Sequence, residues 1–98
     1  MKYTVYVDEN SHYMDESERY THGEFPTAEA AISAAKKIVD DYLLSAHKRG
    51  MTADELWRSY VDWGEDPFII PEDAQSKFSA WDYAKQRCRE LCGEEPRP

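Results

Sequence analysis

Residues 27–50 read TAEAAISAAKKIVDDYLLSAHKRG, and this stretch decides the fold. Its apolar side chains recur every three or four positions, which is the spacing of one face of a helix. Thr27 is a hydroxyl residue of the kind that caps a helix start, and Gly50 is typical of the position after a helix end. The stretch therefore predicts a helix over residues 28–49 with one buried stripe, formed by Ala28, Ala31, Ile32, Ala35, Val39, Tyr42, Leu43 and Ala46.

The polar side of this helix carries charges at helical spacing. Lys36 lies one turn before Asp40, and Lys37 lies one turn before Asp41, so both spacings suit ion pairs within the helix. Residues 47–49 are basic and would complement the helix dipole in the last turn.

Two further amphipathic runs begin with a hydroxyl residue and are followed by a glycine, as the first one is. Thr52 opens one with a capping box that ends at Glu55, and Gly64 closes it. Ser79 opens the other and Gly93 closes it. We expect each closing glycine to adopt the left-handed conformation that ends a helix. Four aromatic residues in and just after the first of these runs form a cluster that we expect mostly in the core: Trp57, Tyr60, Trp63 and Phe68. A tryptophan of this cluster that is left exposed would be a candidate binding anchor.

Three stretches indicate strands. Residues 3–8 alternate, with Tyr3, Val5 and Val7 on one side. Residues 18–25 read as the partner strand, and residues 68–70 form a short apolar run between two prolines. In the partner strand, simple alternation separates two sets: Arg19, Thr21, Gly23 and Phe25 on one face, and Tyr20, His22 and Glu24 on the other.

These elements predict an α+β fold in the order β-β-α-α-β-α. We expect a small three-stranded sheet, antiparallel or mixed, with helices packed on one face. Residues 1–93 would form a single domain, and residues 94–98 a disordered tail. The structure of the 9–17 loop is left open.

Composition limits the partners. The chain has 98 residues and a net charge of -8, which repels nucleic-acid phosphates and anionic membranes. We therefore expect no nucleic acid and no membrane as partner. The N-terminus has no apolar run typical of a signal peptide, and Cys88 and Cys92 read as buried free thiols, so we expect a cytoplasmic protein.

No motif indicates catalysis or a cofactor. Asp8-x-Asn10-x-His12 begins like a calcium loop, but Tyr13 and Arg19 replace its glycine and its last carboxylate. His12 and His22 read as structural or surface histidines, with a metal site across the hairpin as the alternative. We predict no catalytic residue, metal or cofactor.

Two stretches are similar to known patterns. EFPTAEAA, residues 24–31, is similar to a strand-to-helix junction, Phe-x-Thr-x-Glu-Ala, of many small α+β domains. FSAWDYAK, residues 78–85, together with GEDPF, residues 64–68, resembles a family of small uncharacterised bacterial proteins. The resemblance implies a bacterial cytosolic protein and carries no assigned activity, so no residue takes a role from it.

We therefore hold two hypotheses of function. In the first, the chain is a non-catalytic binding or regulatory module that contacts an unidentified protein, or a second copy in a homodimer, through Tyr6, Tyr13, Arg19, Lys85 and Arg89. In the alternative, it is a small enzyme or ligand-binding protein with a pocket between sheet and helices, lined by His22, Trp57 and Tyr60.

Overall fold

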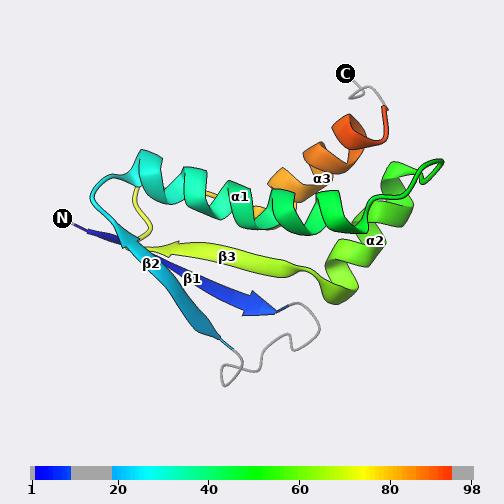
Figure 1. The fold of residues 1–98 in the computed structure, drawn as a ribbon. Helices are drawn as coiled ribbons and strands as arrows, with labels where there is room; N and C mark the ends of the chain where they lie inside the picture. Colours follow the sequence, from blue (N-terminus) through cyan, green and yellow to red (C-terminus); the bar gives the residue numbers. More distant parts are fainter. Residues whose placement is uncertain (1, 10–18, 94–98) are drawn as a thin grey trace.

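The sheet is built around the first strand of the chain. The computed structural model describes residues 2–9 and 19–93, and its elements are β1 (Tyr3–Glu9), β2 (Tyr20–Phe25), α1 (Ala28–Ala46), α2 (Ala53–Trp63), β3 (Glu65–Ile70) and α3 (Ala80–Leu91). The strands run in the order β2-β1-β3, and both pairs are antiparallel (Figure 1). The predicted α+β fold and element order are confirmed. The expected tail at residues 94–98 lies outside the described residues.

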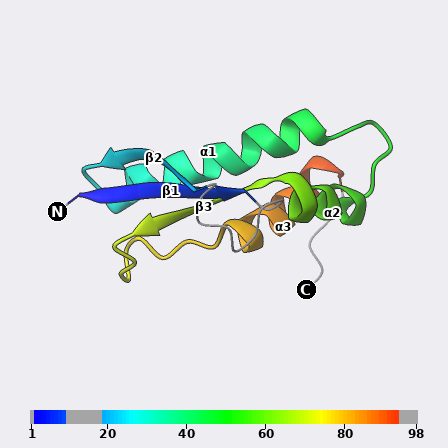
Figure 2. The same cartoon turned by 90° about the horizontal axis from the view of Figure 1, so that it is seen from below.

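One face of the sheet is covered by helices. Tyr3, Val5 and Val7 of β1 point into the core, where the two valines have no exposed surface. The small side chains of Ala28 and Ala31 let α1 approach the sheet closely. Figure 1 shows α1 and α3 above the strands, and Figure 2, seen from below, shows the strands on the near side of the helices. The opposite face of the sheet carries no helix among the described residues.

A bulge in the β1–β2 pair changes the predicted faces of β2. Val5 pairs with Gly23 and Tyr6 pairs with Thr21, so His22 is an extra residue. An extra residue reverses the side-chain alternation beyond it. Tyr20 and His22 therefore lie on the helix side, as Phe25 does. The prediction that Tyr20 and His22 lie on the face opposite Phe25 is wrong.

The helix ends differ from prediction in two places. Helix α1 stops at Ala46 because His47 is already extended, so residues 47–49, predicted to fill its last turn, lie outside it. Gly50 and Gly93 have the expected positive φ, but Gly64 has a φ of -76°. Glycine is required at 64 for lack of space: a Cβ there would lie 2.7 Å from the Tyr60 carbonyl oxygen and would also meet the Tyr60 ring.

Strand β3 is longer than predicted. It begins at Glu65, directly after Gly64, so Glu65 and Asp66 belong to a strand and not to a loop. Pro67 lies inside it, and an edge strand can accept a proline because one side of its backbone needs no partner.

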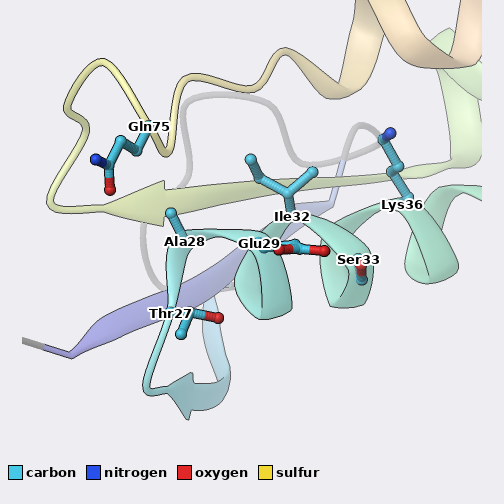
Figure 3. Close-up of a pocket in the computed structure, with 7 residues that line it drawn as sticks. All are labelled: Thr27, Ala28, Glu29, Ile32, Ser33, Lys36 and Gln75. Carbon is cyan, nitrogen blue, oxygen red and sulfur yellow. The ribbon is translucent and has the colours of Figure 1, made fainter.

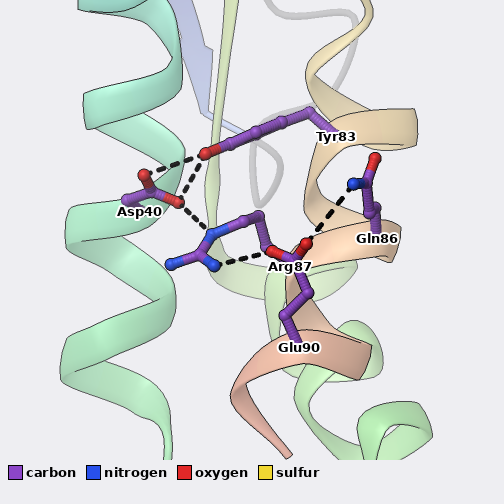
Figure 4. Close-up of polar contacts among 5 residues, drawn as sticks. All are labelled: Asp40, Tyr83, Gln86, Arg87 and Glu90. Atoms are coloured by element: carbon purple, nitrogen blue, oxygen red, sulfur yellow. Dashed lines mark hydrogen bonds and ion pairs between the residues drawn. The ribbon is translucent and has the colours of Figure 1, made fainter. Parts of the chain in front are cut away.

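A polar network joins α1 to α3 (Figure 4). The carboxylate of Asp40 accepts hydrogen bonds from Tyr83 Oη at 2.9 and 3.0 Å and from Arg87 Nε at 2.8 Å. Arg87 also pairs with Glu90 at 2.7 Å. The predicted Lys36–Asp40 pair is therefore replaced by a contact between helices. The Lys37–Asp41 pair is present, at 3.0 Å.

Candidate functional site

Two aromatic rings lie side by side on the sheet face that no described helix covers. Tyr6 of β1 is directly opposite Phe68 of β3, and their rings stack with centroids 5.7 Å apart. The guanidinium carbon of Arg19 lies 4.9 Å from the centre of the Phe68 ring. We call Tyr6, Asp8, Arg19 and Phe68 the outer-face cluster.

Arg19 is held over the ring by a carboxylate. Its Nε donates to Asp8 Oδ1 at 2.7 Å, and a terminal nitrogen donates to Asp8 Oδ2 at 3.1 Å. This two-point contact fixes the plane of the guanidinium and neutralises its charge. The cluster therefore presents rigid, flat surfaces with no net charge of their own.

A second carboxyl lies beside this ion pair. Asp66 is directly opposite Asp8 in the β1–β3 pair. Burial and the nearby Asp8 charge raise the pKa of Asp66 to about 6, although a hydrogen bond from Trp81 opposes the shift. Glu65 and Asp66 precede the predicted strand of residues 68–70, and the structure places them in alternation along β3.

The structure brings together two of the five residues predicted to bind a partner. Tyr6 and Arg19 meet in the outer-face cluster, and Tyr13 lies outside the described residues. Lys85 is exposed and Arg89 half-buried on α3, which lies on the helix side of the sheet. Phe68 and Asp8 complete the cluster. Alternation along residues 3–8 puts Asp8 on the same strand face as Tyr6, but only the strand register, which periodicity does not give, could have placed Phe68 beside them.

The pocket predicted from His22, Trp57 and Tyr60 does not form as a unit. His22 lines a hollow of about 390 Å³ between β2 and α1. Trp57 packs edge-on against Trp81 in the helical core, with centroids 5.7 Å apart. Tyr60 has no exposed surface, and its hydroxyl donates to the Glu65 carbonyl oxygen at 2.6 Å. Core packing of α2 thus takes two of the three residues away from the hollow.

We call the hollow that His22 lines the β2–α1 hollow. Its volume falls within the range of small-molecule sites, about 300–1,000 Å³. It is lined by two tyrosines, two carboxylates, one histidine, one serine and one aliphatic side chain: Tyr20, His22, Ile38, Asp41, Tyr42, Ser45 and Glu65.

A larger hollow of about 530 Å³ lies at the start of α1 (Figure 3). Helix α1 and its cap supply Thr27, Ala28, Glu29, Ile32, Ser33 and Lys36, while Gln75 stands across from them. One helix therefore forms almost the whole wall, and we assign it no ligand.

Trp63 is an exposed tryptophan, and the sequence makes an exposed tryptophan a candidate binding anchor. It was expected in the core, but 70% of its surface is exposed. Trp63 follows Ser59 by one turn on the same face of α2. Ser59 contacts the Tyr42 hydroxyl of α1, so that face is turned toward α1. Trp63 is the last residue of α2, and the residue directly after it, Gly64, is buried while Trp63 is exposed, so helical spacing alone misplaces Trp63.

Among the described residues, the cysteines and acids show no reactive arrangement. Burial raises the pKa of the Cys88 thiol to about 11, so this thiol is not an activated nucleophile. Within residues 2–9 and 19–93, no three His, Cys, Asp or Glu side chains are grouped so that they could hold a metal ion. Nor does this part of the chain contain a helix long and apolar enough to cross a bilayer.

Comparison with known protein families, curated proteins and solved structures finds no match to this chain. The resemblance drawn from residues 64–68 and 78–85 therefore stays an expectation.

Proposed function

We propose that this chain is a non-catalytic, cytosolic binding module that docks a protein partner on the outer-face cluster. The observation that carries the proposal is the stack of Tyr6 and Phe68 under Arg19 on a sheet face that no described helix covers. Tyrosine and arginine are enriched among the residues that dominate binding energy at protein interfaces.

The rigidity of the cluster supports the same proposal. Asp8 holds Arg19 at two points, and the ring stack holds Tyr6, so little side-chain freedom remains to be lost on binding. The neighbouring Ile70 is 49% exposed and extends the apolar surface along β3. A partner that places apolar or aromatic side chains over these rings would fit. The buried thiol of Cys88 supports the cytosolic location.

The test compares two variants of the outer-face cluster with one control variant outside it. Tyr6→Thr keeps a residue suited to a strand, and Arg19→Ala removes the guanidinium. Lys48→Ala, an exposed position after α1, is the control. We expect the wild type and the control to capture the same protein from a lysate, and both outer-face variants to lose it. Equal capture by all four proteins, or by none, would contradict the proposal.

Two additions make the assay sharper. Light scattering on each protein measures self-association, and a dimer that Tyr6→Thr dissolves would identify the partner as a second copy. The double variant Lys85→Ala/Arg89→Ala measures whether the basic positions of α3 contribute to capture.

A further inference from the structure

The β2–α1 hollow has aromatic walls that are fixed in place. The Tyr20 hydroxyl donates a hydrogen bond to the Glu65 carboxylate. On the other wall, the Tyr42 hydroxyl donates to the Ser59 carbonyl oxygen at 2.9 Å and lies 2.6 Å from Ser59 Oγ. Both rings are therefore anchored through their hydroxyls, and Ile38 adds an apolar surface to the lining.

The hollow also carries negative charge that the described chain does not balance. The half-buried carboxylate of Glu65 has one polar contact among the described residues, the Tyr20 hydroxyl, and no cationic partner there. Glu65 is also directly opposite Glu9 in the β1–β3 pair. Asp41 adds a second carboxylate, although Lys37 pairs with it at the exposed rim.

This combination of surfaces selects one class of ligand. Tyrosine rings attract a cation, and a carboxylate accepts hydrogen bonds from it. Ile38 and the rings give apolar contact to a short methylene chain. A bare metal ion suits the hollow poorly, because among the described residues its histidine and two carboxylates are not grouped so that they could hold one.

We propose that the β2–α1 hollow binds a primary alkylammonium group, with its nitrogen at Glu65 and its methylene stem against Ile38 and the two tyrosines. The group could belong to a free small amine or to a lysine side chain of another protein. This proposal goes beyond the protein-docking function, because the hollow lies on the helix side of the sheet and the outer-face cluster on the other.

The first experiment is a calorimetric titration of the full chain with butylammonium chloride, with butanol as the uncharged ligand of the same length. We expect heat of binding with the ammonium only. Glu65→Gln keeps an acceptor for Tyr20 and removes the charge, and we expect it to weaken binding by about tenfold or more. Glu29→Gln, the control, removes one charge from the far end of α1 and is expected to change affinity by less than about twofold.

A second variant guards against a folding defect in Glu65→Gln. Ser45→Lys places an ammonium of the protein's own at the wall of the hollow, on an exposed helical position, and should abolish binding. Amide NMR shifts on titration of the wild type should concentrate at the seven lining residues. The proposal is wrong if butylammonium gives no heat, if butanol binds equally well, or if Glu65→Gln and Glu29→Gln weaken binding to the same degree.

The source of the amine is decided in the same assay. A short peptide with one lysine is compared with the same peptide carrying norleucine. Binding of the lysine peptide about tenfold tighter than butylammonium identifies a protein side chain, and equal or weaker binding identifies a free amine. Tyr6→Thr should leave all these affinities unchanged, so failure of the hollow and failure of the outer-face cluster give different results.

Discussion

Replacing Gly64 with alanine should destabilise the protein more than any other replacement of a described glycine by alanine. The added methyl group would lie 2.7 Å from the Tyr60 carbonyl oxygen and would meet the Tyr60 ring. Tyr60 has no exposed surface and cannot swing into solvent. The backbone at the end of α2 must therefore shift.

The size of the effect follows from two losses. Overpacking a well-packed site costs about 1–3 kcal/mol. A shift of Tyr60 also strains its hydrogen bond to the Glu65 carbonyl oxygen, which is 2.6 Å long, at about 0.5–1.5 kcal/mol. Together we expect about 2–4 kcal/mol, a large share of the 5–15 kcal/mol that is typical for a whole domain.

Urea unfolding followed by tryptophan fluorescence measures this change. Gly50→Ala is the matched control, because Gly50 has a φ of +85° and no atom lies within 4 Å of the added Cβ. That variant carries only the left-handed backbone cost of about 1–2 kcal/mol. A Gly64→Ala midpoint equal to or above that of Gly50→Ala would refute the steric reasoning.

Three other outcomes are expected. The pKa of Asp66 is raised from 3.8 to about 6, so the contribution of Asp66 favours folding at low pH and is lost as pH rises through 6. In thermal melts, Asp66→Asn should therefore be more stable than the wild type at pH 8 and show no such gain at pH 4. Tyr83→Phe should lower the free energy of unfolding by about 1 kcal/mol. Asp40→Ala should lower it by more, because that variant also removes the hydrogen bond from Arg87. Urea midpoints measure both changes, and equal losses would contradict this reasoning. Cys88, 1% exposed, should resist iodoacetamide in the native protein at pH 8 and react in urea, as peptide mass spectrometry would show; rapid native labelling would contradict its burial.

The secondary structure was largely predictable because its signals are local. Thr27, Thr52 and Ser79 each accept a hydrogen bond from the backbone three residues on, at 3.1, 3.2 and 3.3 Å. Such caps depend only on neighbours in the chain, so a sequence pattern contains all that is needed to find them. The alternation of residues 3–8 is equally local, and the side that it assigns to Tyr3, Val5 and Val7 is the buried side of β1.

The candidate sites were less predictable because they depend on contacts between distant residues. The bulge at His22 exists only in the pairing of β1 with β2, and it moves Tyr20 to the helix side. Asp40 finds Arg87 across 47 positions, in place of the lysine one turn away. Periodicity indicates which face of a helix is apolar, but not which residue is buried where the helix ends: Trp63 is 70% exposed and Gly64, directly after it, is buried.

The central position of β1 also bears on how the molecule is made. Strand β1 is the only neighbour shared by β2 and β3 in the described sheet, and its second partner ends at Ile70. A ribosome must therefore complete α1 and α2 before the second ladder can close. A fragment that begins after residue 9 would retain two edge strands with nothing between them, so the first few residues of this chain act as the template for a sheet finished much later in synthesis.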